Sequence, residues 1–176
     1  ELLLKPVSAN QFNGLIGIVP DKNKSGRYNI TGDIQLSLLN TLGRAEKVDM
    51  QWKKTETKSQ QLNLLAEWPF MLNTPFGAEG QLSMLKQDTS FLSIDMKIGS
   101  FILFNGNNSA SGYYSDKRTI VLKPKDTIET IATKSYGTGI GLKTYKLNNL
   151  LNPRTGYRIN LTIEAGNRIA DISETD

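Results

Sequence analysis

The sequence predicts an all-β fold, an antiparallel meander of about eight or nine strands joined by turns. Apolar and polar residues alternate along most of the chain, and side chains of a strand point to opposite faces with a period of two. The alternation is clearest over residues 28–38, where Ile34 and Leu36 fall on one face and Asp33 and Gln35 on the other. Clusters of Gly, Pro, Asn and Asp separate the alternating stretches, and helical periodicity is nearly absent.

The strands predicted by this alternation are typically about ten residues long. Pro69 ends the fourth of them, because proline cannot donate a hydrogen bond to the ladder. The pair Asn105-Gly106 is a strong hairpin signal. Residues 123–135 interrupt the pattern, and residues 126–132 are compatible with a short helix or a loop. The predicted strands cover residues 12–20, 28–38, 47–53, 61–68, 78–84, 92–104, 109–115, 136–145 and 157–165.

Two architectures are compatible with the polar face of this sheet, which carries charges of both signs. In a soluble β-sandwich or small barrel the face meets bulk water, whereas in a membrane β-barrel it lines a water-filled lumen. The strands are longer than the usual 5–6 residues, and aromatic residues lie near the ends of the apolar faces, which favours the membrane barrel. The charged residues are Asp33, Asp49, Lys53, Glu67, Asp95, Lys97, Arg158 and Glu164. The aromatic residues are Tyr28, Trp52, Trp68, Phe70, Phe76, Phe104 and Tyr157.

The composition argues against several functional classes. The chain of 176 residues has a formal net charge of +4 and contains neither cysteine nor histidine. Because the commonest general base and metal ligand is missing, we expect no catalytic site, metal or cofactor, and we interpret Asp33 and Asp49 as solvated carboxylates. The basic residues form no run that predicts nucleic-acid binding. Residues 1–6 are too short an apolar stretch for a signal peptide, and no run of about 18 apolar residues predicts a membrane-spanning helix.

Three segments carry turn motifs with specific spacing. Residues 61–71 form a strand that runs into Trp-Pro-Phe, and residues 73–77 follow as Asn-Thr-Pro-Phe-Gly. Residues 40–46 read Asn-Thr-Leu-Gly-Arg-Ala-Glu, and residues 145–158 contain the turn Asn-Pro-Arg-Thr-Gly. Together these segments resemble the BamA/TamA-like family of outer-membrane protein insertases, the bacterial surface antigen barrels. The motif residues are Asn40, Gly43, Pro69, Pro75, Gly77, Asn149, Pro153 and Gly156.

Two positions depart from the pattern of that family. Ala45 stands where a second glycine is usual, and Asn148 stands where aspartate is usual. Residues 87–91, which read Gln-Asp-Thr-Ser-Phe, additionally resemble members from Bacteroidetes-type bacteria.

The resemblance covers residues 11–167 but only the first half of a family barrel of sixteen strands. It implies that residues 1–10 link into the barrel and that residues 11–176 form a partial transmembrane β-barrel in the bacterial outer membrane. The implied activity is not enzymatic: such barrels insert or export other outer-membrane proteins, and POTRA domains are expected upstream. The implied partners are outer-membrane lipid, nascent outer-membrane protein substrates, and the strands or subunits that complete the assembly. No nucleic acid is among them.

The resemblance also implies a lateral gate at the first strand. In family barrels this strand pairs weakly with the last one, and a substrate strand adds there by β-augmentation. Residues 12–19 alternate poorly and contain two glycines, as a weakly paired edge would. The same features are equally compatible with an ordinary first strand that frays and contains glycine but forms no gate. The implied gate residues are Phe12, Gly14, Ile16, Gly17 and Ile18.

Three alternatives remain open from the sequence. A passive porin or structural outer-membrane protein keeps the barrel without the insertase activity. A soluble carbohydrate-binding β-sandwich keeps only the strands. Residues 122–132 resemble the start of a LysM peptidoglycan-binding module, with residues 148–151 as its second half. We interpret residues 122–132 instead as an extracellular loop that leads into the next strand.

Overall fold

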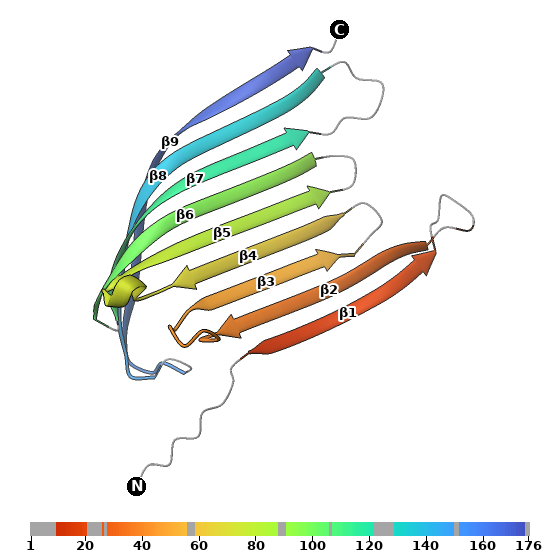
Figure 1. Cartoon of the computed structure of the whole chain (residues 1–176). Coiled ribbons are helices and arrows are strands. Elements are labelled where there is room, and N and C mark those ends of the chain that lie inside the picture. Colours follow the sequence, from red (N-terminus) through yellow and green to blue (C-terminus); the bar gives the residue numbers. More distant parts are fainter. Residues whose placement is uncertain are drawn as a thin grey trace.

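The computed structural model describes residues 10–20, 26, 28–55, 59–87, 91–105, 107–121, 129–149 and 152–174. In them nine antiparallel strands form one sheet, and each strand pairs with its neighbours in the chain (Figure 1). The prediction of an all-β antiparallel meander is confirmed. The described sheet is open, because its two edge strands do not pair with each other. The strands are β1 (Gln11–Pro20), β2 (Tyr28–Leu39), β3 (Lys47–Lys54), β4 (Gln60–Trp68), β5 (Phe76–Gln87), β6 (Phe91–Asn105), β7 (Asn108–Val121), β8 (Glu129–Leu147) and β9 (Gly156–Glu174), with a 3-10 turn η1 (Met71–Asn73) before β5.

Alternation along the strands gives the sheet an apolar face and a polar face. In β2, Leu36 lies on the apolar face and Gln35 on the polar face. The register carries both faces into the next strand, where Leu36 lies beside Met50 and Gln35 beside Gln51. A slip of one residue would exchange the two faces, so the pattern specifies this register. A row of polar residues therefore crosses five strands: Asn13, Gln35, Gln51, Asn63 and Ser83.

The apolar face is largely uncovered by the described residues. Ile98, Ile140 and Ile163 on this face are each more than half exposed. Among the described residues, the buried hydrophobic side chain is Tyr113, which lies on the polar face and is 9% exposed. The sheet is curved (Figure 1), and its hollows are lined mainly by residues of the polar face. The chain thus presents a wide apolar surface that needs a partner or a lipid phase to cover it.

The strands run between two ends of the sheet, which we name the turn end and the far end. The turn end holds the β2–β3, β4–β5, β6–β7 and β8–β9 connections, and the far end holds the other four. Strands β6 to β9 have 14–19 residues, whereas β1 to β5 have 8–12. In the part of the chain that the structure describes, no helix is long and apolar enough to cross a membrane.

The structure differs from the sequence prediction in the second half of the chain. β7 does not end at Ser115 but continues to Val121, because charged residues on its apolar face interrupt the pattern without interrupting the pairing. β9 likewise extends beyond the predicted end, to Glu174. The possible helix is wrong over residues 129–132, which belong to β8, and residues 126–128 lie outside the described residues. The LysM alternative is also wrong, since β8 runs where that module requires helix.

Candidate functional site: the edge strand β1 and the polar face

β1 is the edge strand that the resemblance marks as a gate. It pairs with β2 over its whole length, from Gln11 beside Ser37 to Pro20 beside Tyr28. No described strand pairs with its other edge. A row of backbone N–H and C=O groups on that edge is therefore a template for a further strand. The predicted gate residues all lie on this strand: Phe12, Gly14, Ile16, Gly17 and Ile18.

The two halves of β1 differ in polarity. In the first half, Gln11 and Asn13 occupy the polar face. In the second half Leu15 and Val19 occupy that face, so the strand is apolar on both sides, and Leu15 is 74% exposed. Strands that are apolar on both faces are usually covered on both faces. The half of β1 toward the far end therefore gains most from a covering partner.

Side-chain interactions between described residues fasten β1 to the sheet. The Thr31 hydroxyl donates a long hydrogen bond of 3.3 Å to the carbonyl oxygen of Gly17. A Cβ at Gly14 would meet the ring of Phe12, which belongs to the same strand. At the turn end, Asn10 Oδ1 accepts hydrogen bonds from the backbone N–H of Leu39 and from the hydroxyl of Thr41. β1 is thus held mainly by its backbone ladder with β2.

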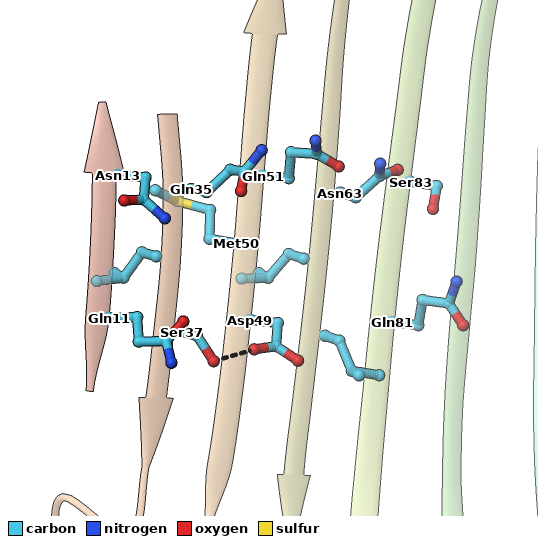
Figure 2. A pocket seen from close by; sticks show the side chains of 13 residues that line it. Gln11, Asn13, Gln35, Ser37, Asp49, Met50, Gln51, Asn63, Gln81 and Ser83 are labelled. Carbon is cyan, nitrogen blue, oxygen red and sulfur yellow. Dashed lines mark hydrogen bonds between the residues drawn. The ribbon is translucent and has the colours of Figure 1, made fainter. Parts of the chain in front are cut away.

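A trough of about 600 Å³ lies on the polar face across β1 to β5 (Figure 2). The Ser37 hydroxyl donates to Asp49 Oδ1 at 2.6 Å, and Lys47 Nζ lies 2.8 Å from Asp49 Oδ2. This carboxylate is therefore paired, and the trough presents mainly uncharged donors and acceptors. The other polar side chains that line it are Gln11, Asn13, Gln35, Ser37, Gln51, Asn63, Gln81 and Ser83.

A second cluster on the polar face ties β9 to β7. The Glu164 carboxylate accepts hydrogen bonds from the Tyr113 hydroxyl at 3.0 Å and from the Ser115 hydroxyl at 2.6 Å. These residues lie on strands that do not pair with each other, because β8 runs between them. The bonds therefore fasten three strands together.

Glycine on β8 makes this cluster possible. A Cβ at Gly139 would come within 2.4 Å of Cζ of Tyr113, so the ring lies where a side chain would otherwise be. Lys97 Nζ lies 4.1 Å from the centroid of the same ring, in a cation–π contact. The alternation of polar and apolar residues does not predict this cluster. Its signal is the run of alternating glycines over residues 137–141, which leaves room for a side chain from a neighbouring strand.

The first turn motif is held together by Asn40 and Glu46. Asn40 Oδ1 accepts from the backbone N–H of Ala45 at 2.7 Å. Glu46 is a buried residue, 8% exposed, and its carboxylate accepts hydrogen bonds from the backbone N–H groups of Leu42 and Arg44. These bonds, with that from Leu42 the strongest cause, lower the pKa of Glu46 below its usual value.

Two residues of this turn have a left-handed backbone. Gly43 has a φ of 76°, and Ala45 has a φ of 59°. A Cβ is strained in this region of backbone conformation, so glycine suits position 43 and Ala45 is strained. The Arg44 guanidinium lies 5.9 Å from the ring centroid of Trp68, which joins the turn to the end of β4.

The second turn motif begins after Pro69. Phe70, Leu72 and Asn73 all have φ values near +54° to +61°, so the chain reverses through a strained, left-handed path. The carbonyl oxygen of Pro75 accepts a hydrogen bond of 2.9 Å from the backbone N–H of Leu103 on β6. Gly77 is buried beneath Phe101, whose ring occupies the space of a Cβ.

The third turn motif is organised by Asn148. Its Oδ1 accepts hydrogen bonds from the backbone N–H groups of Arg154 and Thr155 at 2.9 and 3.1 Å. An aspartate at this position would accept the same two bonds. Asn149 Oδ1 accepts from the backbone N–H of Asn152, just before Pro153. Gly156 has a φ of 126°, and a Cβ there would come within 1.9 Å of the Lys146 carbonyl oxygen.

All three turns therefore lie at the turn end, and Asn10 joins the first of them to the start of β1. The predicted gate residues lie along β1 itself. The fold and its site define a curved, open sheet with an uncovered apolar face, a polar trough and an edge strand of mixed polarity. Comparisons with models of protein families, with characterised proteins and with solved structures gave no match.

Proposed function

We propose that this chain is part of an outer-membrane β-barrel that inserts or exports other outer-membrane proteins. The observation that carries the proposal is the combination of an uncovered apolar face and a hollowed polar face on nine antiparallel strands. In a membrane barrel, lipid covers such an apolar face and a water-filled lumen meets such a polar face. Outside a membrane, bulk water would meet both faces and leave the apolar one uncovered. The turn motifs that resemble the BamA/TamA-like family support the same function.

Aromatic residues at the turn end support a membrane interface there. They lie at the ends of four different strands and all are more than one-third exposed. Tryptophan and tyrosine place an apolar ring in lipid and a polar group in the head-group region, which is why they form girdles around membrane barrels. These residues are Trp68, Phe76, Phe104 and Tyr157.

The lateral gate is proposed at β1, as the resemblance implies. The free edge of this strand offers backbone groups to an incoming strand, and its far-end half offers apolar side chains on both faces. Between the described residues, the side-chain bond from Thr31 to Gly17 that joins β1 to β2 is long, at 3.3 Å. An incoming barrel strand, itself apolar on one face, would satisfy the edge and cover Leu15 or Ile16 at the same time.

Cysteine crosslinking tests the gate, because the chain contains no cysteine. We expect Gly14→Cys and Ile16→Cys to form disulfide adducts with cysteine-bearing nascent barrel strands during assembly in membranes. Leu82→Cys, on the apolar face of the central strand β5, is the matched control and should form none. Failure of both β1 variants to form any adduct, or equal adducts at Leu82, would contradict the gate.

A passive porin is the second candidate, and the trough lined by amides and hydroxyls favours it. Uncharged donors and acceptors of this kind suit hydrated polar solutes. A steady conductance in planar bilayers without substrate adducts at β1 would favour the porin over the insertase. A monodisperse monomer in water without detergent would contradict both and favour the soluble β-sandwich.

A further inference from the structure

The apolar face carries a small set of charges that gather toward the far end of the sheet. Among its described side chains, one acid, Asp116, lies there with four cations, whereas Lys146 lies at the turn end of β8. The positions follow from the register and from alternation along each strand. The four cations are Lys54, Lys86, Arg118 and Lys134.

Asp116 organises the two cations nearest to it. Its side chain is 11% exposed, and the residue lies between Met96 on β6 and Tyr136 on β8. Asp116 Oδ1 accepts from Arg118 Nε at 2.9 Å, and its Oδ2 lies 3.8 Å from Lys134 Nζ. The acid thus holds both cations in place but neutralises only one of the two charges.

The two cations remain accessible on the lipid side of the sheet. The side chains of Arg118 and Lys134 are 60% and 48% exposed, and Lys134 Nζ lies 5.8 Å from the centroid of the Tyr136 ring. Toward the turn end, the same face continues with exposed apolar residues such as Ile98 and Ile140. Charged heads above an apolar surface match the two parts of a phosphate-bearing lipid.

We propose that Arg118 and Lys134 bind the phosphate head group of a membrane lipid, with Tyr136 beside it and the acyl chains along the apolar face below. This inference rests on the proposed membrane location, which brings lipid to that face. Arg118 donates from Nε and Nη2 to Asp116 at 2.9 and 3.5 Å, which holds the guanidinium in position before the lipid arrives and leaves its Nη1 donors for phosphate oxygens. The site would recognise the charge of the phosphate, so a zwitterionic lipid of the same chain length binds it more weakly.

The test is the affinity of the full chain, in neutral detergent micelles, for dioleoyl phosphatidic acid by native mass spectrometry. We expect the double variant Arg118→Gln, Lys134→Gln to weaken binding about twenty-five-fold, since each interfacial cation contributes about fivefold. The matched control is Lys117→Gln, Lys143→Gln, which removes the same charge from the same two strands on the polar face. It should change the affinity by less than about threefold.

Dioleoyl phosphatidylcholine and inorganic phosphate complete the experiment. Weak binding of phosphatidylcholine, and no displacement of phosphatidic acid by inorganic phosphate, are the expected results. Equal weakening by the two double variants, displacement by inorganic phosphate, or no binding of phosphatidic acid would each overturn the lipid site. Circular dichroism shows whether each variant keeps its strands.

Membrane insertion is measured separately, by protease protection in phosphatidylcholine vesicles. A chain that inserts but shows no preference for phosphatidic acid contradicts the lipid site alone. A chain that does not insert contradicts the proposed function itself.

Discussion

The two edge strands of the sheet are built differently. β1 has 10 residues and loses its polar face after Asn13, whereas β9 has 19 residues and keeps the alternation through Arg158, Thr162 and Glu164. Glu164 is tied across β8 to β7 by two hydrogen bonds, while the long bond from Thr31 to Gly17 joins β1 to β2. The chain therefore has one edge reinforced by side chains and one edge held mainly by backbone.

This difference matters because, among the described residues, neither edge strand pairs with a further strand on its outer side. A strand edge exchanges partners more readily when few side-chain contacts must break with it. The length, the polarity and the side-chain hydrogen bonds of β9 favour stable pairing with one neighbouring strand. Those of β1 favour pairing with a strand that can be exchanged for another. Four predictions test this comparison, from the largest expected effect to the smallest.

The largest effect is expected where the β8–β9 hairpin turns. Gly156→Ala places a Cβ against the Lys146 carbonyl oxygen at a φ that L-residues rarely adopt, and should cost about 3 kcal/mol of unfolding free energy. Gly43→Ala is the matched control in the turn nearer to β1: its φ is 76° and no atom lies within 4 Å, so it should cost about 1 kcal/mol. Urea unfolding of the refolded chain measures the unfolding free energy of both variants. Equal losses of stability in the two variants would contradict the expected difference between the two turns.

The second prediction concerns the ties of β9. Tyr113→Phe and Glu164→Gln should each destabilise the chain by about 1 kcal/mol, because they remove or weaken a hydrogen bond to a partly exposed carboxylate. Thr31→Val, on the β1 side, should cost less than about 0.5 kcal/mol. Hydrogen exchange should show faster exchange in β9 for the first two variants. Additive effects of Tyr113→Phe and Glu164→Gln in a double-mutant cycle would mean that the hydrogen bond between Tyr113 and Glu164 does not contribute to stability.

The third prediction concerns a substitution that should stabilise the turn next to β1. Ala45→Gly relieves the left-handed backbone of Ala45 but adds freedom to the unfolded chain, for a net gain of about 0.5 kcal/mol. Ala78→Gly, within β5, should instead lose about 0.5–1 kcal/mol, since glycine is unfavourable inside a strand. A loss of stability at both positions would contradict the strain at Ala45.

The smallest effect is the pH dependence of the same turn. The pKa of Glu46 is lowered in the folded chain, so its contribution to stability is present above the ordinary pKa of 4.5 and is lost as the pH falls through the folded value. Stability measured from pH 6 downward should therefore decline in acid, and Glu46→Gln should make that decline shallower. An unchanged slope in the variant would show that other carboxylates account for it.

Alternation with a period of two predicted most of the fold. It identified β2 to β6 within a few residues because their polar and apolar sides are cleanly separated, and β1 was found despite its poor alternation. It stopped early in β7, since Asp116 and Arg118 lie on the apolar face and only the register with β6 and β8 shows that the strand continues. The alternation is interrupted near the start of β8, where residues 126–132 are compatible with a helix or a loop, and the pairing of residues 129–132 with β9 decides for a strand there.

The sequence by itself determined the two faces of the sheet, the strands that alternate well and the positions of the turns. These features are local, since they depend on side-chain direction along one strand and on the backbone freedom of residues such as Gly43 and Gly156. Only the tertiary structure decided which residues meet across strands: Glu164 with Tyr113, Asp116 with Lys134, and β1 as an edge with few ties. Contacts between distant residues depend on the register and the order of the strands. The period of two determines only which face of the sheet a side chain lies on, so it does not predict these contacts.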